Sequence, residues 1–134
     1  RDALTAAAEF VLAAESSARM QSGIVATVGE IEVRSAASNV IPGRVALTVD
    51  VRSAQDSARR VAAGTLEHLA RGIATRRSLQ LDWRVVQETA AARCDTELCA
   101  TLVRAGTCIG LPLVVYLGLR ASAFALVEVS PALS

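Results

Sequence analysis

The segment SNVIPGRVALTVDVRS, residues 38–53, joins a Pro-Gly turn to a run of strictly alternating residues. Consecutive side chains of a β-strand point to opposite faces of the sheet, so the alternation predicts a strand over residues 44–52 with one apolar and one polar face. The apolar parity comprises Val45, Leu47, Val49 and Val51, and the polar parity comprises Arg44, Ala46, Thr48, Asp50 and Arg52. Such a strand fits a sheet that packs on a core with one face and meets solvent with the other.

The segments around this strand predict further helices and strands. Apolar residues at helical spacing indicate helices over residues 3–20, 53–77 and 95–109, whereas alternation indicates strands over residues 24–34 and 79–88. Ser53 is the expected N-cap of the second helix, and the parity of the first strand switches at Gly29, which predicts a β-bulge there. Together they predict an α+β fold, a two-layer sandwich of a largely antiparallel sheet with helices on one face.

The composition limits the classes of partner. The length of 134 residues is typical of a single domain, and 52% of the residues are hydrophobic, so the chain can bury a core. The net charge of +1 gives no electrostatic reason to expect a nucleic acid or an anionic membrane as a partner. Arg120 and Glu128 interrupt the apolar residues near the C-terminus, which therefore make a poor membrane span.

The cysteines indicate a reducing compartment. Cys94, Cys99 and Cys108 form no CxxC pair, and their spacing does not match a zinc ribbon. An odd number of cysteines, with no secretory signal pattern, predicts reduced thiols in a cytoplasmic protein. Because the chain begins at Arg1 and not at Met, we expect it to be a piece of a longer protein.

No catalytic group can be assembled from the residues alone. His68 is the only histidine, it falls in the middle of a predicted helix, and its neighbour Glu67 does not share its face. A zinc site needs several converging ligands, so we expect this chain to bind no metal and His68 to have a surface or packing role. Ser38 and Ser53 lack a base partner, and Cys94 has no nearby histidine to activate it.

Several segments together resemble one family. They are Ala26-Thr27-Val28-Gly29 within the first strand, residues 38–52, residues 73–83 with Trp83, and Cys94-Asp95 before a helix that ends at Leu111-Pro112. Over residues 1–112 the chain is similar to metal-dependent amidohydrolases of the zinc aminoacylase and carboxypeptidase group. The nearest branch is that of the N-carbamoyl-L-amino-acid hydrolases and allantoate amidohydrolases.

The resemblance implies a structural and functional role. It implies a ferredoxin-like lid and dimerisation domain that forms a homodimer, in an enzyme whose separate catalytic domain holds two divalent metal ions, zinc or manganese. It also implies that Asn39 and Arg52 contact a small carboxylate-bearing substrate. An arginine can hold a carboxylate through two parallel hydrogen bonds, and an asparagine offers a donor and an acceptor to a ureido group. The residues alone leave open that Asn39 is a turn residue and Arg52 a solvated charge.

The C-terminal segment departs from the family pattern. We expect residues 1–112 to form the lid and dimerisation domain and residues 113–134 to be an atypical apolar tail, such as a truncated or frame-shifted continuation would have. Residues 113–119 are strand-like, and residues 120–134 are apolar without a clear period. The family's Gly-His-Asp motif does not follow. The alternative hypothesis is therefore a non-catalytic α+β interaction module or gene relic that only self-associates through a sheet edge.

Overall fold

A computed structural model describes residues 1–34, 37–93, 95–108 and 121–131 of the chain. These residues form three helices and four strands. In chain order they are α1 (Ala3–Arg19), β1 (Ile24–Arg34), β2 (Arg44–Ser53), α2 (Asp56–Arg76), β3 (Leu79–Thr89), α3 (Thr96–Cys108) and β4 (Ala121–Pro131).

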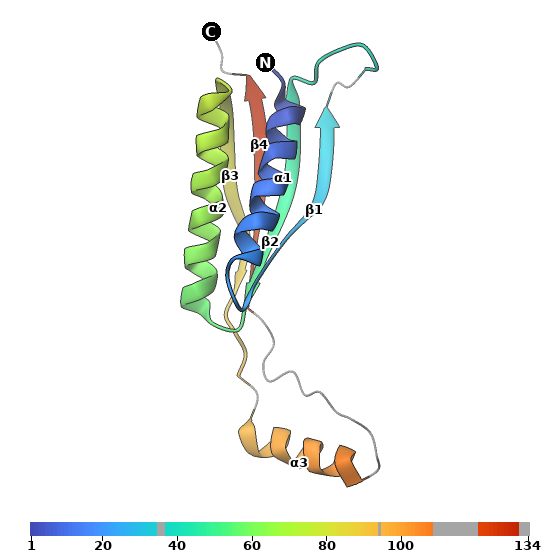
Figure 1. Ribbon diagram of the computed structural model, residues 1–134, viewed down its shortest axis with the longest axis vertical. Coiled ribbons are helices and arrows are strands. Elements are labelled where there is room, and N and C mark those ends of the chain that lie inside the picture. Colours follow the sequence, from blue (N-terminus) through green and yellow to red (C-terminus); the bar gives the residue numbers. More distant parts are fainter. Residues whose placement is uncertain (35–36, 94, 109–120, 132–134) are drawn as a thin grey trace.

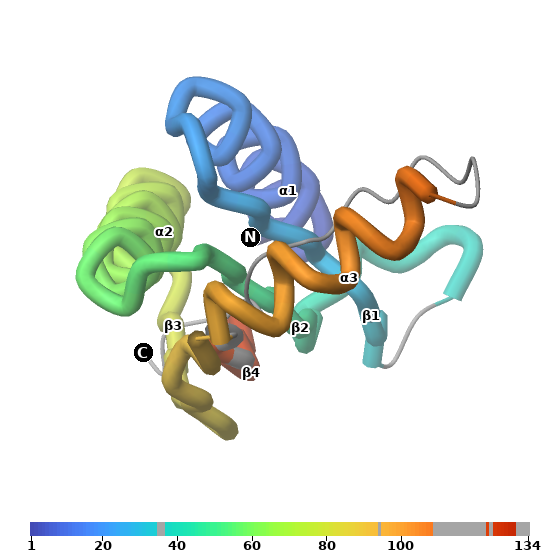
Figure 2. The backbone as a smooth tube through the Cα atoms, turned by 90° about the horizontal axis from the view of Figure 1, so that it is seen from below, coloured from blue at the N-terminus to red at the C-terminus, as the bar shows by residue number. Residues whose placement is uncertain are grey.

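The four strands form one antiparallel sheet in the order β1-β2-β4-β3. Helices α1 and α2 lie side by side on one face of this sheet, as Figure 1 and Figure 2 show. The predicted α+β sandwich with helices on one face is therefore confirmed. Because β2 and β3 both run antiparallel to β4, they are parallel to each other, and α2 is the crossover that joins them.

The core lies between the two helices and the sheet. The apolar parity of β2 faces the helices, and Val45, Leu47, Val49 and Val51 are at most 2% exposed. On the opposite face Ala46 and Thr48 are also buried, because β2 has a neighbouring strand on each side. Trp83 of β3 packs against the core and meets Phe10 of α1 edge to face, with ring centroids 6.1 Å apart.

The predicted bulge at Gly29 is confirmed. The pairing of β1 with β2 shifts register between Val28 and Glu30, so two residues of β1 oppose one residue of β2. The Glu30 backbone N–H then donates to the hydroxyl oxygen of Thr48 at 3.1 Å. The bulge therefore leaves this amide with a partner although it has moved out of the regular ladder.

Ser53 is not the N-cap of α2, so that prediction was wrong. Ser53 is the last residue of β2 and pairs with Ile24, and α2 begins at Asp56 after Gln55. The Ser53 hydroxyl oxygen instead accepts a hydrogen bond from the Gln55 N–H at 3.2 Å, within the turn. The strand ladder extends further than the sequence pattern indicates and displaces the start of the helix.

Strand β4 is the element that the sequence pattern did not indicate. It lies within the residues described above as apolar without a clear period, and it occupies the sheet between β2 and β3. Its helix-facing residues Ala123, Ala125, Val127 and Val129 do alternate, and all are buried. Phe124 and Leu126 on the other parity are apolar too, which hides the alternation. The sheet thus continues past residue 112, while the strand expected over residues 113–119 lies outside the described residues.

Helix α3 lies away from the sandwich, below its lower end in Figure 1. It makes no extensive contact with any other described helix or strand. The Asp95 carboxylate caps its N-terminus by accepting from the Leu98 N–H at 2.8 Å, as expected for an acidic residue there. Neither α3 nor any other helix in the described ranges has the length and apolar character that crossing a membrane requires.

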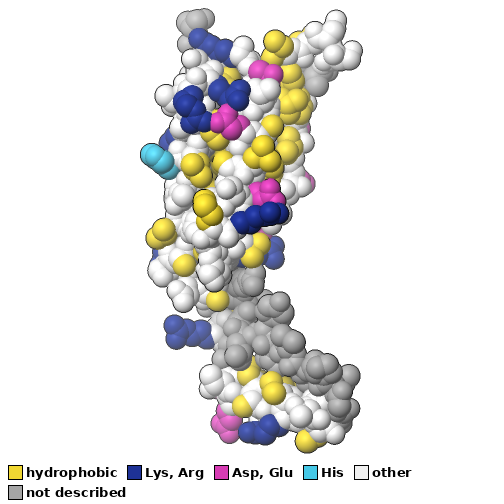
Figure 3. All heavy atoms as spheres, viewed as in Figure 1, with side chains coloured by type: hydrophobic (Ala, Val, Ile, Leu, Met, Phe, Trp, Pro, Cys, Tyr) yellow, Lys and Arg dark blue, Asp and Glu magenta, His cyan; other side chains and the backbone are white. Residues whose placement is uncertain are grey.

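An ion-pair cluster joins the two helices that cover the sheet. The Glu9 carboxylate of α1 accepts hydrogen bonds from Arg76 at the end of α2 and from Arg77 just beyond it, the latter at 2.7 Å. Arg77 also donates to the Thr5 hydroxyl at 3.0 Å. The hydrogen bond from Arg77 and the positive charge of both arginines hold the pKa of Glu9 below its usual value. Basic and acidic side chains lie next to each other on this face in Figure 3.

We expect this cluster to make the stability depend on pH in the acid range. A lowered pKa in the folded state means that Glu9 stabilises the fold above pH 4.5, and that this contribution disappears as the pH falls through the lowered folded-state value. The variant Glu9→Gln should therefore have a lower free energy of unfolding at pH 7. Its free energy of unfolding should also fall less than that of the unchanged protein between pH 5 and pH 3, about the range in which a carboxyl group of this kind takes up its proton. Urea unfolding of both proteins at pH 7, pH 5 and pH 3 measures this. An equal change in the free energy of unfolding with pH for Glu9→Gln and for the unchanged protein would contradict the expectation.

Candidate functional site

Arg52 lies on the uncovered face of the sheet, near the end of β2. Its side chain is half exposed, and its Nε donates to Asp50 Oδ2 at 2.5 Å. Asp50 stands two residues earlier on the same face and is 19% exposed. The Asp50 carboxylate thus orients the guanidinium through its Nε edge. A rigid strand thus presents a preoriented cation to solvent.

Asn39 lies in the connection between β1 and β2, in a tight turn. The Val40 N–H donates to the Ala37 carbonyl at 3.2 Å, and Ser38 and Asn39 are the two central residues of this turn. Asn39 is exposed. Near this end of the sheet, Arg34 and Arg44 share the Glu128 carboxylate, and the hydrogen bond that Arg34 donates to Glu32 raises the pKa of Arg34. Asn39 therefore has the turn position expected from the sequence and is also accessible to a ligand.

The structure does not bring Asn39 and Arg52 together. Asn39 precedes the first residue of β2, and Arg52 is the last but one residue of the same strand. The eight steps from Arg44 to Arg52 alone extend about 26 Å at roughly 3.3 Å per residue. Within one chain the two side chains cannot contact the same amino-acid-sized molecule.

A buried arginine, which the sequence analysis missed, organises the end of the sheet that carries Arg52. Arg59 of α2 is 1% exposed, and its Nη2 donates to Glu88 Oε1 of β3 at 2.6 Å and to Asp56 Oδ1 at 3.5 Å. Asp56 Oδ1 also accepts from the Ala91 N–H at 3.1 Å. One signal could have revealed it, because Arg59 continues the helical spacing of the buried residues Ala62, Leu66, Ala70, Ile73 and Ala74.

We expect an asymmetric response to removing either member of this pair. Glu88→Ala leaves the buried guanidinium with only the longer Asp56 contact and should cost about 2–4 kcal/mol of unfolding free energy. Arg59→Met keeps the volume, and the half-exposed Glu88 returns to water, so the cost should stay below about 1.5 kcal/mol. Urea unfolding of both variants and of the double variant decides the matter. The double variant should be more stable than Glu88→Ala, because it no longer buries an unpaired guanidinium. The reverse order would refute the explanation that Glu88→Ala is destabilised by the unpaired charge of Arg59.

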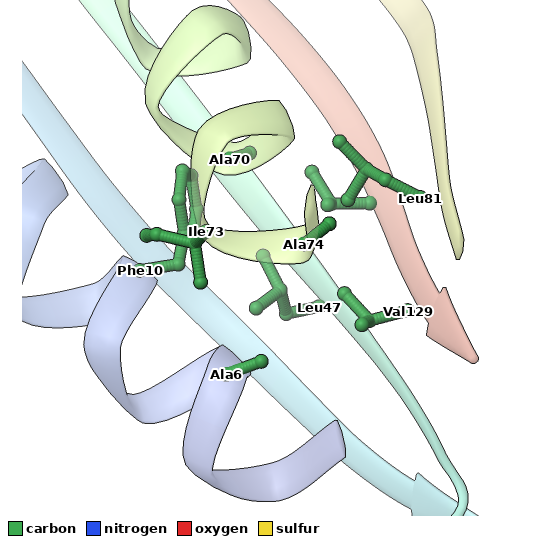
Figure 4. A pocket seen from close by; sticks show the side chains of 9 residues that line it. Ala6, Phe10, Leu47, Ala70, Ile73, Ala74, Leu81 and Val129 are labelled. Carbon is green, nitrogen blue, oxygen red and sulfur yellow. The ribbon is translucent and has the colours of Figure 1, made fainter. Parts of the chain in front are cut away.

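The described residues line a small apolar hollow and a more open polar one. One, between α1, α2 and the sheet, is lined only by apolar residues such as Phe10, Leu47 and Ile73 (Figure 4) and measures about 10 Å³. That is about the space of one water molecule, so it is a packing gap and not a substrate site. The other is an open polar hollow at the start of α2. It is lined by Ala54, Gln55, Asp56, Ser57, Arg60, Ala91 and Arg93.

The described residues do not form a metal site. They contain no cluster of three or more His, Cys, Asp or Glu side chains that could hold an ion. His68 lies exposed on α2, as expected, and projects from the surface in Figure 3. The carboxylates of Asp50 and Glu128 are engaged with arginines. The pair of divalent ions that the family resemblance implies therefore does not fit the residues described here.

No protein-family model matches the chain. A protein named probable allantoate deiminase from Oryza sativa subsp. japonica is 32% identical, over 78% of this chain and 25% of its own length. Allantoate deiminase 1 of Glycine max is 36% identical, over 62% of this chain and 17% of its own length. The N-carbamoyl-L-amino acid amidohydrolase of Geobacillus stearothermophilus is 31% identical, over 84% of this chain and 27% of its own length.

The chain belongs to the family of allantoate deiminases and N-carbamoyl-L-amino acid amidohydrolases. The resemblance that the sequence motifs indicated is therefore confirmed. The chain spans about a quarter or less of the length of these relatives, as a segment of such an amidohydrolase would. Amidohydrolases of this family are generally metal-dependent. Most of the length of each of these relatives lies outside the part that matches this chain.

We expect the isolated polypeptide to bind no stoichiometric zinc or manganese and to hydrolyse no N-carbamoyl amino acid. The physical reason is that the single histidine is exposed and the His, Cys, Asp and Glu side chains of the described residues do not converge in the groups of three or four that such ions need. Elemental analysis after dialysis against each metal, combined with an ammonia-release assay, measures both properties. One tightly held ion per chain would show this expectation to be wrong.

Proposed function

We propose that this chain is the substrate-contacting and dimerising domain of a metal-dependent amidohydrolase that cleaves linear C–N amide, amidine or ureido bonds. Its substrate is a small carboxylate-bearing molecule of the N-carbamoyl amino acid or allantoate type. The chain alone is inactive, and the metal ligands and the general base belong to a separate catalytic domain. The similarity to relatives bearing these names carries the proposal.

Arg52 supports this role by the way it is mounted. The guanidinium stands on a strand whose opposite parity is fully buried, and Asp50 fixes its edge. A planar fork held in this way suits two parallel hydrogen bonds to a carboxylate. A rigid element also loses little freedom on binding, which is the usual requirement for a substrate clamp.

Asn39 serves the same function from the other end of the sheet. Because it cannot share a ligand with Arg52 of its own chain, it would contact a substrate bound elsewhere in a dimer. We propose a homodimer that uses a sheet edge and the adjacent helix, since β1 and β3 each leave one edge unpaired in the described sheet. Sedimentation over a range of concentrations tests this association.

A chimeric enzyme tests the function directly. The segment of the Geobacillus stearothermophilus amidohydrolase that matches this chain is replaced by the chain itself, and ammonia release is measured with an N-carbamoyl amino acid, allantoate and an aminoacyl amide. Activity toward one of the carboxylate-bearing substrates would support the proposal. A chimera that melts cooperatively, binds its metal ions and dimerises, yet turns over none of the three, would refute it in favour of a module that only self-associates.

A further inference from the structure

The polar hollow at the start of α2 has the dimensions of a small-molecule site. It measures about 460 Å³, which lies within the range of about 300–1,000 Å³ that such sites usually have. Two separate segments form its walls, the start of α2 and residues 91–93 beyond β3, and they adjoin at the lower end of the sandwich in Figure 1. Neither Asn39 nor Arg52 lines this hollow, so the function proposed above does not account for it.

Two arginines that line the hollow have no acidic partner. Arg60 stands on α2, Arg93 lies beyond β3, and both are exposed. Neither guanidinium makes a hydrogen bond or an ion pair with another residue of the described ranges. Most other described arginines are instead paired with a carboxylate. The hollow therefore presents two guanidiniums, from different walls, whose donors are available to a ligand.

The acidic residue in the wall of the hollow does not neutralise these two arginines. Asp56 Oδ1 accepts from Arg59 Nη2 at 3.5 Å and from the Ala91 N–H at 3.1 Å. Arg59 is 1% exposed and also donates to Glu88 at 2.6 Å. The cluster therefore contains three guanidiniums and two carboxylates, and its one excess positive charge favours an anion.

The hollow is held in shape before any ligand enters it. The hydrogen bond from the Ala91 N–H to Asp56 ties one wall to the other, and the buried Arg59 holds the same carboxylate from behind. Gln55 and Ser57 also line the hollow, and the Gln55 side chain makes no hydrogen bond to the start of α2. Their side chains add neutral donors beside the two exposed guanidiniums. Walls that are fixed in advance lose little conformational freedom on binding.

We propose that this hollow binds a small molecule through a phosphate or carboxylate group. Arg60 and Arg93 hold the oxyanion from the two walls through charge-assisted hydrogen bonds, which are about twice as strong as neutral ones. Gln55 and Ser57 donate to oxygen atoms that the arginines leave free. A bound anion joins α2 to the segment beyond β3 and stabilises the folded chain by mass action.

Titration of the isotope-labelled chain with inorganic phosphate, followed by NMR, tests this site. Sodium chloride keeps the ionic strength constant, so general screening does not change during the titration. The hollow variant carries Arg60→Gln and Arg93→Gln. The matched control carries Arg71→Gln and Arg84→Gln, which removes the same charge at side chains that are 55% and 63% exposed and do not line the hollow. A second series uses succinate, a dicarboxylate, in place of phosphate.

The expected result is a saturable shift of the Ser57 and Ala91 amide signals with phosphate. The dissociation constant should rise about ten-fold or more in the hollow variant and change less than about two-fold in the control. Saturation with succinate and not with phosphate would also support the site and would identify a carboxylate as the bound group. Saturation with neither anion, or an equal loss of affinity in both variants, would overturn the proposal.

The titration separates this site from the proposed function. It needs no enzymatic activity, and it involves neither Arg52 nor Asn39, so its failure would leave the substrate contacts proposed above untouched. Because Arg60 and Arg93 are exposed, their replacement should leave the remaining amide signals in place, and the spectrum of each variant shows directly that it is folded.

Discussion

Arg52→Lys, introduced into the active chimera, should lower kcat/KM for a carboxylate-bearing substrate by about ten-fold to a few hundred-fold, which is roughly 1.4–3.4 kcal/mol of transition-state stabilisation. Lysine keeps the charge but loses the planar fork that makes two parallel hydrogen bonds. It also cannot be oriented by Asp50 in the way that the Arg52 Nε contact allows. Thermal stability should move little, because the side chain is 56% exposed.

Arg84→Lys provides a matched control for this change. Arg84 stands on β3, lies on the same uncovered face, is 63% exposed and pairs with Asp82, the acidic residue two positions earlier, at 3.0 Å. It thus shares with Arg52 an acidic partner two residues earlier, although it makes the contact through Nη2 and not Nε. Because Arg84 has no proposed ligand, its replacement should leave kcat/KM nearly unchanged. Equal losses of kcat/KM for Arg52→Lys and Arg84→Lys would mean that the effect is not specific to Arg52 and does not come from a substrate contact. Early unfolding of Arg52→Lys with normal kcat/KM would make Arg52 a structural residue.

Leu47→Ala should lower the free energy of unfolding by about 3–5 kcal/mol, the largest stability loss we expect from a single apolar truncation. Leu47 is 1% exposed in the central part of β2, and it borders the gap that Figure 4 shows between α1, α2 and the sheet. Several neighbours in that gap, Ala6, Ala70 and Ala74, are already small. They cannot move inward to fill the space, because each belongs to a helix that is held by its own packing on the sheet.

Leu12→Ala is the corresponding control. Leu12 lies on α1 and is 66% exposed, so its truncation removes little buried surface and should change stability by no more than about 0.5 kcal/mol. Urea unfolding of the two variants measures the difference. A loss below about 1 kcal/mol for Leu47→Ala would mean that the sandwich collapses around the missing side chain.

Several local features followed from the sequence because each depends on residues close to one another in the chain. The alternation of residues 44–52 predicted both faces of β2, and the parity switch at Gly29 predicted the bulge. Asp95 was expected near the start of α3 and caps it. The motif containing Asn39 and Arg52 pointed to the family, which the comparisons confirm. The roles of these two side chains remain predictions.

Other features depended on contacts between distant segments. Ser53 has the chemistry of an N-cap, but pairing with Ile24 keeps it in the sheet. Arg59 is a charged residue on an otherwise apolar helix face, and only the arrival of Glu88 from β3 makes its burial tolerable. Neither outcome can be read from a local pattern, because the deciding partner lies 29 residues or more away in the chain.

Except for β4, the sequence by itself determined which segments are helices or strands and which face of each is apolar, and it also determined which family the motifs belong to. These properties arise from side-chain periodicity and from short motifs, which need no knowledge of neighbours in space. The tertiary structure decided the order of the strands, the place of β4 between β2 and β3, and the separation of Asn39 from Arg52 at opposite ends of β2. An apolar strand can be buried in any slot that offers two hydrogen-bonding edges and an apolar face, so its position follows from packing and not from its own residues.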